Sequence, residues 1–175
     1  MQFEIKGNPD FGEARVALES GESFHAASGA MNWHRGPVTF RPRLMGGVGR
    51  SMVRKVLGGT SMFINEYQAS GPSEVAFSHL IAGTLVQIPV NSEGMLVAGG
   101  AFTACTEGVD LRTRFGGFKA FFSGKGAFFI EASRSGELFF GAYGAVVEKE
   151  LDGELIVRSE EHTSELQSRQ YLVCR

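Results

Sequence analysis

Apolar and polar residues alternate along most of this chain, in short runs that glycine and proline interrupt. A period of two is typical of β-strands with one buried face. Ser20-Gly21, Gly36-Pro37 and Asn91–Gly94 lie between runs as turn residues. The pattern predicts strands near residues 13–18, 23–27, 30–33, 38–42, 61–69 and 74–79, and again near 84–90, 95–99, 101–106, 109–114, 126–133 and 137–142.

Two connectors between these strands have a different period. Val48–Leu57 places four apolar side chains on one face at helical spacing, and Gly117–Phe122 is its weaker counterpart. Strands throughout, with one short helical connector per repeat, predict an all-β fold. We expect a duplicated antiparallel β-sandwich or distorted barrel.

The strand pattern itself repeats along the chain. Gly58–Asn65 aligns with Gly124–Glu131, Glu74–Phe77 with Glu137–Phe140, and Glu22–Met31 with Glu93–Phe102. We therefore predict a single β domain over residues 1–157, with repeats at 13–80 and 84–143 and the start of a third at 148–157. In this alignment Phe63 and Phe129 are equivalent, and we expect both to be buried.

The last eighteen residues have a different origin in this interpretation. Arg158–Ser168 matches the in-frame translation of a common sequencing adapter, and Arg169–Arg175 fits an index and the next adapter stretch. We expect the natural protein to differ after about Val157 and residues 158–175 to be a disordered or opportunistically helical artefact.

Composition narrows the class of protein. The 175 residues are 43% apolar and include 24 Gly and 15 Phe, which fits a globular chain rich in strands and turns. A net charge of −2 argues against a general electrostatic attraction to nucleic acid. The N-terminal Met1–Lys6 alternates like a strand instead of resembling a leader, and apolar stretches are too short to span a bilayer. We expect a soluble, cytoplasmic protein.

Five short motifs carry a family resemblance: Phe3–Lys6, Gly29–Met31, Gly58–Asn65, Gly100–Phe102 and Gly141–Gly144. Over most of its length the chain resembles the bacterial and archaeal branch of the mitochondrial biogenesis family named for altered inheritance of mitochondria. The resemblance implies a fold similar to the tryptophan RNA-binding attenuator protein, with duplicated β-sandwich units that assemble into rings. Eukaryotic members support the architecture of the mitochondrial inner membrane. The family carries no established catalytic motif, and the third repeat expected from it is cut off here.

Candidate chemical groups are few. His25, His34 and His79 stand in no metal-ligand spacing, and Cys105 is a lone cysteine on a predicted strand. The run Gly46–Ser51 fails the spacing of phosphate-binding loops, so a strand-to-helix turn is favoured there. Glu107 and Asp110 flank a turn, where solvated charges are commoner than an acid–base pair. We therefore predict no catalytic residue, no metal site and no cofactor.

Basic residues gather near the two connectors, where phenylalanines are interleaved with them. These weak candidates for anion or surface contact are Arg50, Arg54, Lys55, Arg112, Arg114, Lys119 and Lys125. They fit contact with an anionic membrane surface or nucleic acid. The favoured alternative is that Phe packs the connectors onto the sandwich while the basic side chains reach water.

The preferred hypothesis is a non-enzymatic, oligomeric β-sandwich scaffold or binding protein. The alternative is a small-ligand or RNA-binding regulatory module that uses crevices between subunits, and nothing in the residues supports an enzyme. As partners we expect further copies of the chain, forming a homotrimer in the full-length protein, and a protein or membrane surface, but not nucleic acid. The shortened chain is expected to expose unpaired strand edges and to associate heterogeneously.

Overall fold

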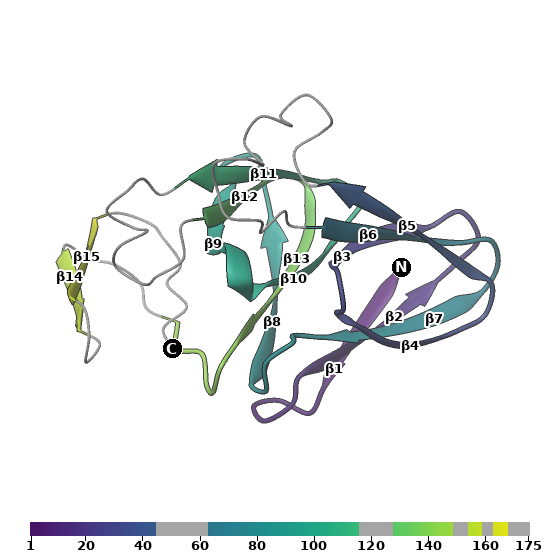
Figure 1. Ribbon diagram of the computed structural model, residues 1–175, viewed down its shortest axis with the longest axis horizontal. Helices are drawn as coiled ribbons and strands as arrows, with labels where there is room; N and C mark the ends of the chain where they lie inside the picture. The colour runs from purple at the N-terminus through teal and green to yellow at the C-terminus, as the bar shows by residue number, and fades with distance from the viewer. Residues whose placement is uncertain (45–62, 116–127, 149–153, 159–162, 168–175) are drawn as a thin grey trace.

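The computed structural model describes residues 1–44, 63–115, 128–148, 154–158 and 163–167, which are almost entirely β-structure (Figure 1). The strands are β1 (Gln2–Lys6), β2 (Glu13–Leu18), β3 (Ser23–Ala27), β4 (Met31–Arg35), β5 (Val38–Leu44), β6 (Phe63–Ala69), β7 (Ser73–Ser78), β8 (Thr84–Val90), β9 (Met95–Ala98), β10 (Phe102–Thr106), β11 (Val109–Phe115), β12 (Phe128–Arg134), β13 (Gly136–Ala142), β14 (Glu154–Arg158) and β15 (Thr163–Gln167). A 3₁₀ turn, η3 (Gly99–Ala101), precedes β10. Both expected helical connectors, Val48–Leu57 and Gly117–Phe122, lie outside the described residues.

The first twelve strands after β1 form two sandwiches with the same strand order. In the first sandwich β2, β7 and β4 pack against β5, β6 and β3, and in the second β8, β13 and β10 pack against β11, β12 and β9. All neighbouring strands pair antiparallel. The predicted all-β class is confirmed, and no closed barrel occurs among the described strands.

The two sandwiches share one continuous sheet. Strand β3 pairs with β10, so that a six-stranded sheet runs in the order β5-β6-β3-β10-β13-β8. Opposite residues at this junction are Ala26 and Ala104, His25 and Cys105, and Phe24 and Thr106. Strand β1 adds to the β2 edge of the first sandwich. Among the described strands, β4 and β9 lie at sheet edges with no strand on their outer side.

Each sandwich encloses its own core, and the shared sheet contributes to both. In β2 burial alternates as the sequence predicts, with Val16 and Leu18 facing the first core. That core also contains Ala104 and Phe139 from the second sandwich, while Ile64 of the first sandwich enters the second core. Opposite faces of the six-stranded sheet therefore cover different cores, and burial of apolar surface holds the sandwiches together.

The expected burial of Phe63 and Phe129 is wrong. Phe63 is 46% exposed and Phe129 is half-buried, whereas Ile130 is fully buried. Strand pairing shows that the two residues are not equivalent: Arg41 lies opposite Glu66, and Arg112 lies opposite Glu131, so the second repeat follows the first by 65 residues here instead of 66. A slip of one residue moves every side chain to the other face of a strand.

The C-terminal residues also differ from expectation. Thr163–Gln167 is strand β15 and pairs antiparallel with β14, where a disordered or helical tail was expected. Strand β14 contains the sequence Leu-Ile-Val, and β-branched residues favour an extended chain that offers a partner strand its hydrogen-bonding edge. This hairpin is a separate two-stranded sheet, at the left of Figure 1.

Candidate functional site

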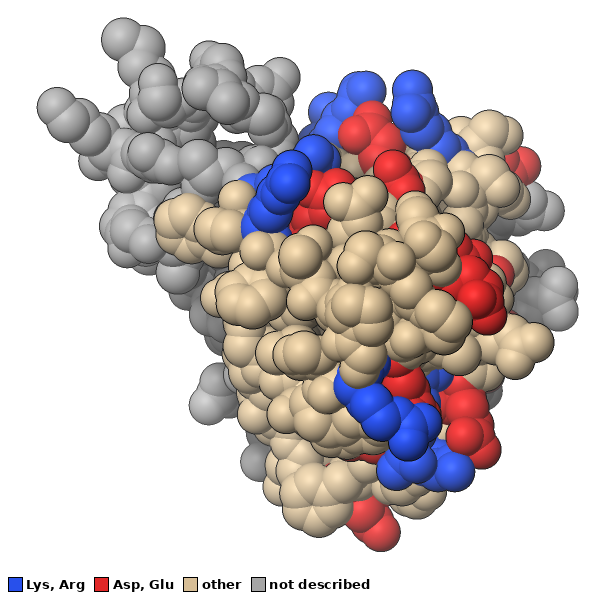
Figure 2. Space-filling model, turned by 90° about the vertical axis from the view of Figure 1, so that its right-hand side faces the viewer, with Lys and Arg blue, Asp and Glu red and all other residues tan. Residues whose placement is uncertain are grey.

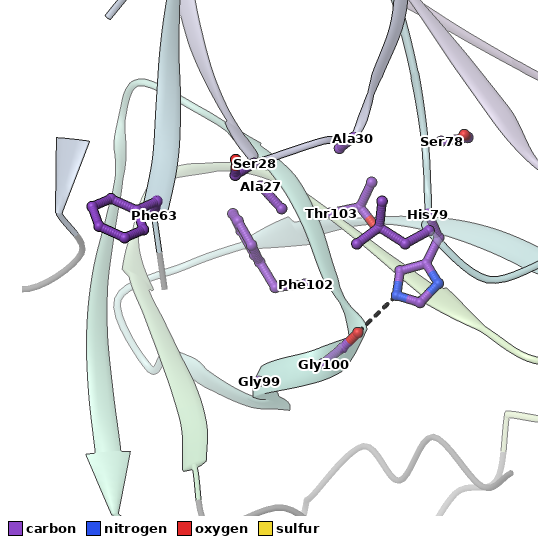
Figure 3. Close-up of a pocket in the computed structure, with 11 residues that line it drawn as sticks. Ala27, Ser28, Ala30, Phe63, Ser78, His79, Gly99, Gly100, Phe102 and Thr103 are labelled. Carbon is purple, nitrogen blue, oxygen red and sulfur yellow. Dashed lines mark hydrogen bonds between the residues drawn. The ribbon is translucent and has the colours of Figure 1, made fainter. Parts of the chain in front are cut away.

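A cavity of about 250 Å³ opens where the two sandwiches meet (Figure 3). Its lining comes from the β3–β4 turn, the start of β6, the segment after β7, η3 and the start of β10. The lining residues are Ala27, Ser28, Ala30, Phe63, Ser78, His79, Leu80, Gly99, Gly100, Phe102 and Thr103. Most of this surface is apolar, so the cavity favours an apolar group over a charged one.

Two equivalent turns face each other across the cavity. The Gly29-Ala30 turn leads into β4 of the first sandwich, and Gly100-Ala101 in η3 leads into β10 of the second. Gly29 adopts a φ of +86°, a left-handed conformation that favours glycine. An added Cβ there would lie 3.4 Å from Leu80, an ordinary contact, so the backbone conformation and not crowding favours glycine. Each copy of the repeated glycine–alanine motif thus contributes one residue, Ala30 or Gly100, to the cavity lining.

His79 ties the second turn to the segment after β7. Its Nε2 lies 2.7 Å from the carbonyl oxygen of Gly100, and its Nδ1 accepts a hydrogen bond of 3.2 Å from the Ile81 amide. These contacts fit a neutral ring that donates through Nε2. Gly141 makes room for it, since an added Cβ would lie 2.2 Å from the His79 side chain. His79 therefore has a structural role, with both ring nitrogens engaged.

Two of the hydroxyl groups at the cavity, those of Ser78 and Thr103, are also engaged within the protein. Ser78 donates to Asn32 Oδ1 at 3.0 Å, and Thr103 donates to the Ala101 carbonyl at 3.4 Å. Neither hydroxyl contacts a general base among the described residues. What the cavity offers is an apolar surface whose rim is exposed: Phe63 at 46%, Leu80 at 71% and Ile81, beside it, at 45%. We call these three residues the apolar rim.

The basic candidates are divided by the structure. Arg50, Arg54, Lys55, Lys119 and Lys125 lie outside the described residues. Arg112 contacts Asp110 through Nε and Nη2 at 3.2 and 3.1 Å, and Arg114 holds both carboxylate oxygens of Glu131 at 2.8 and 3.1 Å. The Arg114 guanidinium lowers the pKa of Glu131 by hydrogen bonding.

Both described candidates therefore face a carboxylate on their own sheet. An equivalent pair, Arg43 and Glu66 at 2.8 Å, stands on the first sandwich. On the face shown in Figure 2, blue and red residues lie next to each other in the charged areas. Such mixed charge offers an anion little net attraction, in line with the interpretation that these side chains are solvated.

The remaining histidines and the cysteine lie apart from the cavity. His25 is buried on β3, and burial lowers its pKa. His34 is exposed on β4. Cys105 is buried on β10, which raises the pKa of its thiol to about 12 and makes it unreactive. In the part of the chain that the structure describes, no group of three or more potential ligands is placed to hold a metal ion.

The remaining motifs have separate surroundings. Glu107 accepts a hydrogen bond from Ser23, while Asp110 pairs with Arg112, so the two carboxylates have different partners. The Gly46–Ser51 run lies outside the described residues. Sequence reasoning missed the cavity, although its signal was present as the repeated Gly29-Ala30 and Gly100-Ala101 pairs. None of the described helical segments has the length and hydropathy needed to cross a membrane.

Comparison with known proteins gives three consistent findings. The family model described as mitochondrial biogenesis AIM24 matches residues 3–163. Uncharacterized protein M6_Spy0233 of Streptococcus pyogenes serotype M6 is 28% identical over 167 residues, which covers 87% of this chain and 65% of that protein. The chain thus spans less than two-thirds of this relative's length. The crystal structure of protein SPYM3_0169 from Streptococcus pyogenes matches with a TM-score of 0.72 and 26% identity, over 89% of this chain and 71% of that one.

Proposed function

The chain belongs to the mitochondrial biogenesis AIM24 family, and we propose that it is a non-enzymatic, oligomeric β-sandwich protein that acts as a scaffold or binding module. The observation that carries this proposal is the apolar rim around the cavity between the two sandwiches. Large apolar side chains that gather on an exposed surface are typical of interaction sites. Leu80 and Phe63 belong to both the cavity lining and the exposed surface.

The chemistry at this site supports binding over catalysis. His79 is the titratable side chain among the described lining residues, and backbone groups engage both of its nitrogens. A general base needs a free nitrogen or oxygen within hydrogen-bond reach of the proton that it removes. The cavity walls instead offer methyl groups and aromatic carbon to a partner.

The second candidate is a regulatory module that binds a small ligand in a crevice. The apolar cavity favours this function, but its volume of about 250 Å³ is below the range of roughly 300–1,000 Å³ usual for ligand pockets. It suits one aliphatic or aromatic group. An RNA ligand is less well supported, because Arg112 and Arg114 pair with carboxylates.

We also propose an attenuator-protein-like assembly of several copies, as the family resemblance implies, with the homotrimer as the state of a full-length protein. The compared proteins come from Streptococcus pyogenes, which supports a prokaryotic origin, and the cytoplasm is the proposed compartment. A protein or a membrane surface is the proposed further partner there.

Sedimentation velocity over a wide range of protein concentrations tests the oligomeric part of the proposal. We expect species larger than the monomer, with a population that rises with concentration. A monomer throughout the range would contradict it. Native mass spectrometry of the purified chain tests the small-ligand alternative, which requires a co-purified mass. Leu80→Glu in the cavity lining should remove this mass. The control Val147→Glu, at an exposed site outside the lining, should retain it.

A further inference from the structure

The two edge strands β4 and β9 are the structural counterparts of the two strands that join the sandwiches. Strand β4 occupies in the first sandwich the place of β10 in the second, and β9 occupies in the second the place of β3 in the first. Inside the chain, β3 and β10 pair with each other. The outer sides of β4 and β9 carry no strand among the described residues. Within the described residues, the counterpart of each junction strand is therefore unpaired on its outer side.

The equivalence holds residue by residue. Strand β10 has a bulge between Phe102 and Ala104, and β4 has the same bulge between Met31 and Trp33. The residues of β10 after the bulge, Ala104–Thr106, are those that pair with β3. On the other side, His25 lies opposite Glu66, and Leu96 lies opposite the equivalent Glu131. Counterparts of the junction residues can therefore be assigned in a single register.

The side chains at the β9 edge suit an interface. Leu96 is 41% exposed, and Ala98 and Phe129, on the same face of the sheet, are half-buried. Their counterparts in the first sandwich are His25, Ala27 and Ile64, on the face turned toward the second core. Ile64 lies in that core, and Ala27 packs against it. The face that carries Leu96, Ala98 and Phe129 thus has apolar side chains at the positions that cover a neighbouring core at the internal junction.

The β4 edge has matching features. Trp33 is 37% exposed and is the counterpart of Ala104. At the internal junction, Ala104 is buried in the first core. Asn32 and Arg35 bond to Glu13 on β2 and Glu74 on β7 of the same sheet. These contacts use side chains, so they leave the outer backbone groups of β4 available for a strand.

Within one molecule the two edges do not meet. Strand β4 lies at the right of Figure 1 and β9 lies beyond the shared sheet, in the left half. Pairing of β4 with β9 therefore takes two molecules. Pairing of two different surfaces is heterologous, and it generates a ring when the rotation closes or a chain of molecules when it does not.

Building on the proposed oligomeric function, we propose that β4 of one molecule pairs antiparallel with β9 of a second copy, in the register of the internal β3–β10 junction. Transfer of that register places Trp33 opposite Val97, His34 opposite Leu96 and Arg35 opposite Met95. The pairing joins the four-stranded sheet of one molecule to the three-stranded sheet of the next, and opposite faces of the joined sheet cover the cores of the two molecules. Backbone pairing removes two unpaired edges, which are otherwise sites of unspecific association.

Cysteine cross-linking tests this register on the whole chain. His34→Cys and Leu96→Cys are introduced together, with Cys174→Ser to remove the C-terminal thiol, and the protein is oxidised mildly. Cys105 stays in place because it is buried. We expect disulfide-linked multimers on a non-reducing gel, since opposite residues of antiparallel strands bring their Cβ atoms within disulfide reach.

Arg35→Cys combined with Leu96→Cys is the matched control. In the proposed register residue 35 points to the opposite face from residue 96, so little cross-linked product is expected. Mixing the single variants His34→Cys and Leu96→Cys sharpens the test. In the proposed register the mixture yields a 34–96 heterodimer and stops there, because each molecule then carries one reactive edge.

A charge at the edge provides an independent measurement. Leu96→Lys is expected to weaken self-association about tenfold or more in sedimentation velocity, as charged residues do at strand edges. Oligomers without a 34–96 cross-link, or equal cross-linking in the control, overturn the edge pairing and leave the oligomeric function standing. A monomer at every concentration overturns both proposals.

Discussion

The internal junction and the free edges of this protein are built from equivalent strands, yet their surroundings differ. Four of the five residues of β3 and of β10 are buried, whereas β4 exposes four of five, and β9 buries Val97 alone. The strand order and the bulge are the same in both sandwiches. The neighbouring strand therefore decides whether such a position is buried.

The sequences of the buried junction strand β10 and the exposed edge strand β4 differ in the same way as their burial. Strand β10 reads FTACT, while β4 reads MNWHR and carries its polar groups in contacts with the same sheet. Arg15 lies over the Trp33 ring at 5.5 Å and bonds to Glu13, which also accepts from Asn32. Polar and charged side chains keep an edge strand soluble until a specific partner covers it.

The largest predicted effect compares Phe24 of the junction with its counterpart Met95 at the free edge. Phe24 is buried and stacks on Tyr67, with ring centroids 5.0 Å apart, whereas Met95 is half-buried. Phe24→Ala should lower the free energy of unfolding by about 3–5 kcal/mol through the cavity that it leaves. Met95→Ala should lower it by about 1 kcal/mol. Urea denaturation measures both, and equal losses would contradict the contrast between junction and edge.

The second prediction concerns the contact that His79 makes across the cavity. Gly141→Ala places a Cβ 2.2 Å from the His79 side chain, which must shift and release the Gly100 carbonyl. We expect a loss of about 1–3 kcal/mol from overpacking. Gly100→Ala is the control, since its added Cβ meets no atom within 4 Å, and it should change stability by less than about 0.5 kcal/mol. Equal thermal midpoints for the two variants would refute the clash.

The third prediction uses His25, which is buried at the junction where β9 has Leu96. Burial is the main cause that lowers the pKa of His25, and the charge of Arg43 lowers it further. The charges of Glu66 and Glu107 raise the pKa by smaller amounts. As the pH drops, the unfolded chain therefore binds a proton at this histidine before the folded chain does. The free energy of unfolding is then highest above the ordinary imidazole pKa and falls as the pH drops below it. Between about pH 7 and pH 5 the free energy of unfolding of the unmodified chain should fall, and in His25→Leu it should fall less steeply.

Above about pH 7 the imidazole is neutral in both states, so the two pH profiles should run parallel there. This range is the internal control for the variant. Identical slopes below it would show that His25 does not couple protonation to folding. Guanidinium or urea titrations at each pH measure the profiles directly.

The smallest effect separates the two equivalent ion pairs. Glu66, beside the junction, keeps 17% of its side chain exposed, against 29% for Glu131 beside the free edge. A double-mutant cycle on Arg43 and Glu66 should give a coupling of about 0.2–1 kcal/mol. The cycle on Arg114 and Glu131 should give a smaller coupling that salt removes more completely. A larger coupling at the free edge would reverse the comparison.

Local patterns were enough to place the strands. The predicted 13–18, 23–27 and 84–90 match β2, β3 and β8, because alternation and flanking turn residues act within a few positions. Equivalence of β6 and β12 was assigned one residue out of register: it matched Phe129 with Phe63, whereas strand pairing matches Phe129 with Ile64. Similarity of apolar residues does not distinguish neighbouring registers, whereas the pairing of Arg41 with Glu66 does. The candidate cavity needed both repeats in place, since its walls come from turns about seventy residues apart, and such long-range packing is not a local property.

By itself, the sequence determined that this chain is all-β, roughly where the strands of the two sandwiches lie, that they repeat, and which family the chain resembles. Each of these features follows from side chains close together along the chain. Only the tertiary structure decided that β3 pairs with β10 and that β4 and β9 are left at the edges. Backbone hydrogen bonds between strands are the same for every side chain, so alternation selects the buried face of a strand but not its neighbour. The partner of each strand is selected by long-range packing, such as that of Phe139 in the first core and Ile64 in the second.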